Sequence, residues 1–441
     1  MDFGPSLMTV SFRLVSAALT AALFFNPCRA ALSLADSFAE IEKSNPTVLI
    51  SREAVAQAVA AAEQERAGLL PRVSLDAQQR RTQAVQILNN RPLEQSPVNR
   101  FDGKLTGSLA LLNPAQIAAY RAARKGTAIA ELDERQTLQS VLNVVAQTYF
   151  THMRNVRRIE VLDANVTRAR ELLDLVKRQL DAGVVTQIDV TRAEAQLAIA
   201  EQARLQQDTT VFQSELQLKR LLDRDLSEPL SLAGFTVDRS HPPSLEEGAE
   251  KNALDRRPDY LRATKATEQN RDLVRAAGYQ RFGVLSAFGE YGYATARAFD
   301  GNEKNAWLGG IELSVPIFDG LKTGADKRVA LAQLRAQQLR QRALALQIPA
   351  EVRLASQDAG SRNAQVTVAE RNLQLAQEQL HLAQIRFEGG AVDNREVIEA
   401  QNSLAVASDN RLEAVFQYSL SRLELARARG DVRLILAEQG E

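Results

Sequence analysis

Two stretches of the chain carry the same pattern of apolar positions at an offset of 207 residues, from Ile159 to Val366. Apolar side chains recur at alternating steps of three and four, a heptad spacing that places them in one stripe along a supercoiled helix. The two stripes are Ile159, Leu162, Val166, Ala169, Leu173, Val176 and Leu180, and Val366, Ala369, Leu373, Ala376, Leu380, Ala383 and Phe387. The pattern predicts one very long helix in each half of the chain, over 115–182 and 321–388.

Each predicted long helix ends at a turn that contains glycine, after which a shorter helix returns over 188–222 or 394–429. The turn residues are Gly183 and Val184 in the first half, and Gly389, Gly390 and Ala391 in the second. At 1.5 Å per residue, each long helix spans roughly 100 Å. The duplicated hairpins therefore indicate an extended object. Pro349 lies inside the second long helix and is expected to kink it.

Four further segments alternate between apolar and polar residues, as strands with two different faces do. They cover residues 72–84, 101–111, 283–293 and 307–317, so that two precede each long hairpin. Each has about the ten residues that a tilted membrane-spanning strand needs. Tyr291, Tyr293 and Trp307 on the apolar faces suit an aromatic belt at a membrane interface. The turn-rich stretches between the paired strands, 89–97 and 299–302, are expected to be exposed loops.

The strands, rather than the helices, are the candidates for crossing a membrane, because no later segment is apolar enough for a membrane helix. The alternative is a soluble sheet, but two hairpins with open edges form a poor core. In a membrane the sheet must close completely. The smallest barrels have about eight strands, so four strands per chain require several copies.

Residues 1–30 have the features of a secretory signal peptide. Arg13 precedes an apolar run over 14–25, and Ala30 offers a small residue at the cleavage point. The run is too short for a spanning helix, although an N-terminal anchor is the alternative, and Met8 is a second possible start. Cleavage at Ala30 would remove Cys28, the only cysteine, so that no disulfide or thiolate chemistry is expected.

Composition excludes several classes of function. The chain has 54 basic and 54 acidic residues, so that no nucleic-acid partner is indicated. With only 5% aromatic residues, composition by itself fits a soluble coiled coil. The three histidines, His152, His241 and His381, have no metal-ligand spacing, and there is no glycine-rich phosphate loop. Neither an enzyme nor a cofactor nor a metal site is expected.

The repeat also divides the chain. A first repeat (31–222) follows the signal peptide (1–30) and contains a helix, two strands and a long hairpin. A linker or equatorial segment (223–245), expected to form a small side domain, joins it to the second repeat (246–430). A C-terminal tail (431–441) follows.

Taken together, these features resemble the TolC-like family of outer-membrane efflux and secretion channels. The resemblance covers the whole mature chain, and its marks occur in duplicate and in order. They are Asn45-Pro46 and Arg257-Pro258-Asp259, Leu69-Leu70-Pro71 and the stretch from Val315 to Gly320, and the two tips, 183–193 and 390–400. The resemblance implies a homotrimer. Each protomer would give four strands to a shared twelve-stranded barrel in the outer membrane, which continues into the periplasm as a barrel of helices.

The resemblance also implies a periplasmic gate at the tips. Glu396 and Glu399 stand where relatives carry the acidic residues of the aperture, and a step of three places both on one helix face. Asp189 is the corresponding acid of the first tip. An acid in the first turn of a helix is favourable in any case, so that Asp189 fits a gate and a cap equally well. Relatives often carry a basic residue at the position of Val392, for which Arg395 or Arg192 is a substitute.

The expected function is a passive exit duct of a tripartite efflux system. An inner-membrane pump would supply the energy, and a periplasmic adaptor would dock on the two tips. The alternatives are the outer-membrane channel of a type I protein secretion system and, from a different class, a periplasmic coiled-coil adaptor or scaffold without a pore. Outer-membrane extraction distinguishes the last of these.

Overall fold

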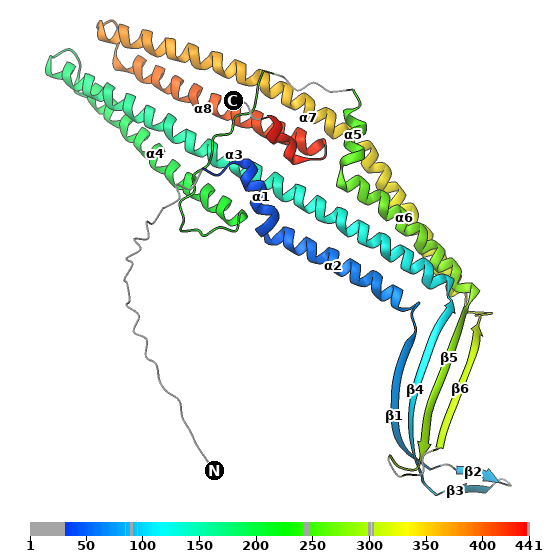
Figure 1. The fold of residues 1–441 in the computed structure, drawn as a ribbon. Helices are drawn as coiled ribbons and strands as arrows, with labels where there is room; N and C mark the ends of the chain where they lie inside the picture. The colour runs from blue at the N-terminus through cyan, green and yellow to red at the C-terminus, as the bar shows by residue number, and fades with distance from the viewer. Residues whose placement is uncertain are drawn as a thin grey trace, which may run out of the picture.

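The computed structural model describes residues 31–438 apart from 84, 89–90, 95, 241–246, 299–300 and 302–303. The expected signal peptide (1–30) lies outside these residues. The molecule is elongated, with a strand region at one end and the turns of two helical hairpins at the other (Figure 1). Within the part of the chain that the structure describes, none of the helices combines the length and the apolarity that a membrane crossing needs.

The two predicted hairpins are confirmed. In the first, α3 (Pro114–Asp181) has 68 residues and α4 (Gln187–Leu221) has 35. In the second, α7 (Lys322–Glu388) has 67 residues and α8 (Asn394–Ala428) has 35. The predicted stripes are the packed faces, since Leu173 and Val176 of α3 and Leu380 and Phe387 of α7 are buried.

Helix α7 runs through Pro349 without a break. It changes direction where it passes α5 (Ala249–Arg256), as the sequence predicted for a helix with an internal proline (Figure 1). Ile348 and Val352, on either side of the proline, are almost fully buried in a cluster with α5. This packing compensates for the hydrogen bond that proline cannot donate.

Shorter helices connect the hairpins to the strands. Helices α1 (Leu34–Ser44) and α2 (Pro46–Ala67) precede the first strand, and α6 (Pro258–Tyr279) precedes the third. Two of the motifs that carry the resemblance are the breaks between these helices, because the residue before a proline favours extended backbone. Asn45 caps α2 by accepting from the N–H of Thr47 at 2.9 Å, and its own amide donates to the carbonyl of Leu221.

The four predicted strands form one antiparallel sheet in the order β1-β4-β5-β6. They are β1 (Arg72–Thr82), β4 (Val98–Leu112), β5 (Val284–Thr295) and β6 (Lys304–Ser314). The connection between β1 and β4 is more regular than predicted. It contains a separate hairpin of β2 (Val85–Leu88) and β3 (Arg91–Glu94), whose alternating Val85 and Ile87 were not recognised as a strand signal.

The strand register places the apolar residues on one face. Leu75 of β1, Leu105 of β4, Tyr291 of β5 and Trp307 of β6 form one continuous row. Leu109, Ala287 and Ile311 form another row on the same face. The intervening rows contain the polar residues Ser74, Asp76, Lys104, Thr106, Glu290 and Glu312. Leu308, Phe288 and Val284 are apolar exceptions on the polar face. On the apolar face, the polar exceptions lie toward the β2–β3 end of the sheet and include Gln79, Arg81 and Asn305.

The main core lies near the middle of the molecule. Tyr149 of α3 and Tyr418 of α8 are almost fully buried there, and the hydroxyl of Tyr149 donates to the carbonyl of Ala233 at 2.6 Å. Phe235 of the joining segment and Ile435 of the C-terminal η2 (Val432–Glu438) are buried in the same cluster. The described parts of the joining segment and of the tail are therefore packed into the common core.

Candidate functional site

The turns of the two hairpins are built in the same way. After α3, the N–H of Gly183 donates to the carbonyl of Leu180, and the N–H of Val184 donates to that of Gln179. After α7, Gly390 and Ala391 make the corresponding bonds to Phe387 and Arg386. This pair of bonds is the Schellman motif, whose central residue must be left-handed. Gly183 has φ 73° and Gly390 has φ 71°, so that both turns require glycine.

We expect Gly390→Ala to loosen the second tip. A Cβ at Gly390 would meet nothing within 4 Å, so the cost is that of the left-handed backbone, about 1 kcal/mol. The Ala391 amide should then exchange its hydrogen roughly fivefold faster in a hydrogen-exchange experiment. Gly360→Ala in the middle of α7 is the matched control, because its Cβ also meets nothing and its φ is not positive. That variant should stabilise its helix, and faster exchange there would contradict the explanation.

The two hairpins pack together at their tips. One apolar cluster takes Val176 from α3, Val190 and Ala193 from α4, Phe387 from α7 and Val397 from α8. These are positions of the predicted heptad stripes and of the restarting helices. The tip is therefore a four-helix unit in which each hairpin is held by the other, and the exposed turns cap it.

A buried asparagine links the hairpins at the same level. Asn394, the first residue of α8, is completely buried, and its Nδ2 donates to the carbonyl of Asp189 at 2.7 Å. Its Oδ1 has no hydrogen-bond partner among the described residues. The equivalent residue of the first repeat, Gln187, is exposed. The sequence analysis missed this link. Its only signal in the sequence is that the second repeat has asparagine where the first has glutamine.

Asp189 is held inside its own helix end. Its carboxylate accepts from the backbone N–H of Thr186 at 2.9 Å and from the Thr186 hydroxyl at 2.6 Å, which forms a capping box. These hydrogen bonds, with a smaller contribution from Arg192 at 3.3 Å, lower the pKa of Asp189. The side chain is largely buried, so that its charge serves the cap in this conformation.

Glu396 and Glu399 lie on one side of α8, and each has an arginine partner in the same protomer. Nη1 of Arg386, from the last turn of α7, is 2.6 Å from Oε1 of Glu396. Nε of Arg395 is 3.1 Å from Oε1 of Glu399, one turn away on α8. The carboxylate side chains are 37% and 64% exposed, and pairs this exposed contribute at most about 1 kcal/mol. The sequence analysis missed Arg386 because it lies on the other helix of the hairpin, and only the turn brings it next to Glu396.

The expected basic partners of the gate bind within one helix. Arg395 reaches Glu399 on α8, and Arg192 reaches Asp189 on α4. Neither joins the two hairpins within the described chain. The turn residues around Gly183 and Gly390 are exposed, including Val184 at 64%, and leave an open surface at the end of the molecule.

The expected aromatic belt lies at the opposite end of the molecule. Tyr291 and Trp307 are paired across β5 and β6, and the rings of Tyr293 and Phe101 are 5.8 Å apart. All four lie on the apolar face, in the part of the sheet that is nearer to the β2–β3 hairpin. Trp307 is 81% exposed, as an interfacial residue of a single protomer would be.

Comparison with known families gives this arrangement its context. The model of the family described as outer membrane efflux protein matches residues 39–224 and 250–431. The chain belongs to this family. The two matched ranges correspond to the two repeats, and the family places the protein in the outer membrane.

Curated relatives agree with this membership. The outer membrane protein TolC of Vibrio cholerae is 22% identical over 90% of this chain and 90% of its own length. The pyoverdine export outer membrane protein OpmQ of Pseudomonas putida is 25% identical over 92% and 85%. Other alignments are shorter. Nodulation protein T of Rhizobium leguminosarum is 25% identical over 63% of this chain and 60% of its own length.

Solved structures show the same fold. CusC superposes with a TM-score of 0.81 at 19% identity, over 91% of this chain and 93% of that one. The outer membrane protein VceC of Vibrio cholerae gives 0.78 at 19% identity, over 90% and 96%. At these identities the likeness concerns the fold, in which the four strands and the duplicated hairpins have direct counterparts.

Proposed function

We propose that this chain is one protomer of a homotrimeric exit duct, whose strands cross the outer membrane and whose hairpins extend into the periplasm. The observation that carries the proposal is the sheet. It has one continuous apolar face, and within the described residues the outer edges of β1 and β6 pair with no other strand. Open edges are not tolerated in a bilayer. Three copies would give twelve strands, enough for a closed barrel.

The long hairpins fit the other part of this duct. The helices are arranged side by side in the same order as the strands to which they connect. Helix α3 packs against both α2 and α6, and α6 packs against α7, which matches the strand order β1-β4-β5-β6. Closing the sheet in a trimer would therefore also close the helices into a tube. The tube would reach roughly 100 Å from the membrane.

The trimer is tested directly by its mass in detergent. We expect the purified mature protein to elute as a stable trimer, measured by light scattering with the detergent contribution subtracted. The physical reason is that one protomer leaves two strand edges open. A monomeric, water-soluble protein would overturn the proposal and favour a periplasmic scaffold without a pore.

We further propose that the duct serves a tripartite efflux system that exports small molecules. The relatives support this, since OpmQ is described as a pyoverdine export protein and ArpC of Pseudomonas putida as the outer membrane protein of an antibiotic efflux pump. A periplasmic adaptor would dock on the exposed tips around Gly183 and Gly390, and an inner-membrane pump would supply the energy. Type I protein secretion would use the same tube. Cross-linking from Val184→Cys, followed by identification of the captured partner, distinguishes the two.

A further inference from the structure

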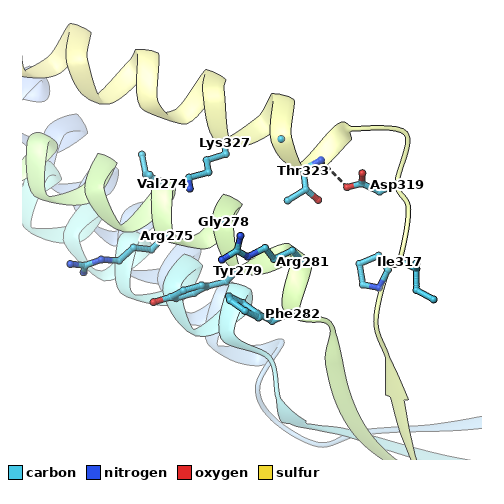
Figure 2. Close-up of a pocket in the computed structure, with 12 residues that line it drawn as sticks. Val274, Arg275, Gly278, Tyr279, Arg281, Phe282, Ile317, Asp319, Thr323 and Lys327 are labelled. Carbon is cyan, nitrogen blue, oxygen red and sulfur yellow. Dashed lines mark hydrogen bonds between the residues drawn. The ribbon is translucent and has the colours of Figure 1, made fainter.

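A pocket of about 490 Å³ lies where the second hairpin meets the sheet (Figure 2). Its walls are the last turns of α6, the short helix η1 (Gln280–Phe282) and the first turns of α7. Strand β5 begins just after η1, at Val284, and β6 ends just before the pocket, at Ser314. The pocket therefore lies at the helical boundary of the strand region, at the opposite end from the β2–β3 hairpin.

Two positively charged side chains of the pocket have no ion-pair partner within the described part of the chain. Arg281 and Lys327 line it and form no hydrogen bond or ion pair with any other residue that the structure describes. The Arg281 guanidinium lies over the ring of Phe282, 4.8 Å from its centroid. Two cations that face one pocket without an acidic partner favour an anion with several oxygen acceptors.

The other charged residues of the pocket form hydrogen bonds within the protein. Arg275 donates to Asp272 at 2.8 Å. Asp319, the acid of the pocket, accepts the backbone N–H of Thr323 at 2.8 Å, the bond drawn in Figure 2. The hydroxyl and the backbone N–H of Thr323 both lower the pKa of Asp319, which therefore keeps a negative charge that offsets one of the two cations. The pocket thus retains a net positive charge.

Large apolar side chains surround these cations. Phe282 is 53% exposed, Ile317 is 100% exposed and the next residue, Phe318, is 81% exposed. Tyr279 packs beside Phe282, with ring centroids 5.9 Å apart. A group of exposed aromatic and aliphatic residues next to cations, at the end of membrane strands, is the composition of a membrane interface.

We propose that this pocket binds the headgroup of an anionic phospholipid of the inner leaflet of the outer membrane. Arg281 and Lys327 would bind the phosphate oxygens, while Phe282 and Ile317 would contact the glycerol and the start of the acyl chains. The inference rests on the proposed orientation of the strands, which puts the α6–α7 end at the periplasmic surface. A soluble phosphate would use the two cations but leave the apolar residues unoccupied, so the occupant is a lipid.

Native mass spectrometry of the delipidated protein tests the site. The protein in detergent is titrated with phosphatidylglycerol or with the zwitterionic phosphatidylethanolamine, and bound lipids are counted. We expect the wild-type protein to prefer phosphatidylglycerol, and Arg281→Gln combined with Lys327→Gln to weaken that binding by about tenfold or more. The control is Arg328→Gln with Arg335→Gln, which removes the same charge from exposed positions of α7 outside the pocket and should change binding less than about twofold.

The outcomes separate this inference from the proposed function. The same spectra report whether the protein is a trimer, so that failure of the trimer and failure of the lipid site are distinct results. Equal binding of the two lipids by the wild-type protein, or equal losses in the two double variants, would overturn the site. Glycerol 3-phosphate, which has the phosphate without acyl chains, is expected not to compete at equal concentration. Competition by it would replace the lipid with a soluble phosphate.

Discussion

Replacement of Ile311 by arginine is expected to prevent assembly of the trimer in membranes. Ile311 is the eighth of the eleven residues of β6 and lies on the apolar face, in a row with Ala287 and Leu109. A guanidinium at this depth faces lipid in the proposed barrel and costs about 2–4 kcal/mol per protomer. Because a trimer contains three such sites, the loss should be large. It is measured as the fraction of trimer recovered from outer-membrane extracts.

Glu312→Arg is the matched control for this prediction. Glu312 is the next residue of the same strand and lies in the polar row with Ser286 and Ala110. An arginine there faces the water-filled interior in the proposed barrel, so trimer recovery should stay close to that of the wild type. The reverse pattern, with Ile311→Arg tolerated and Glu312→Arg not, would mean that the sheet presents its other face to lipid.

The sequence was sufficient to predict these elements because their periodicity reflects burial directly. The heptad stripes became the packed faces of α3 and α7, with Val176, Val366 and Phe387 buried as predicted. The strand alternation is visible in the sequence because, in the proposed barrel, one face of each strand meets lipid and the other meets a water-filled interior. By contrast, β2–β3 has only four residues in each strand, too few for alternation to stand out from a loop rich in turn residues.

The tip contacts were less predictable, because they depend on which residues the turns bring together. Asn394 is a polar residue in a position where the repeat has the exposed Gln187, and nothing local indicates that it is completely buried. Arg386 meets Glu396 only across the turn. Asp189 was predicted equally well as a cap or as a gate residue, and the structure places it in a capping box with Thr186.

The second large effect is expected from Glu396→Gln combined with Glu399→Gln. In a trimer these residues would form a ring of six carboxylates at the narrow end of the tube, as the family resemblance implies. Each carboxylate has an arginine partner in its own protomer, so the ring is balanced by six guanidinium groups from Arg386 and Arg395. Removing the carboxylates leaves those cations in excess. Cation selectivity should therefore fall several-fold, toward a preference for anions.

The measurement is the reversal potential of single channels in planar bilayers under a salt gradient, together with block by divalent cations, which should weaken in the same variant. Arg386→Gln is the variant of opposite sign, because it releases Glu396 and should increase cation selectivity. Both variants alter only exposed ion pairs, which contribute little to stability, so trimer recovery should be unaffected. Opposite shifts in the two variants would locate the constriction at this tip. If neither shifts the selectivity, the constriction lies elsewhere, and Asp189→Asn at the other tip is the next variant to measure.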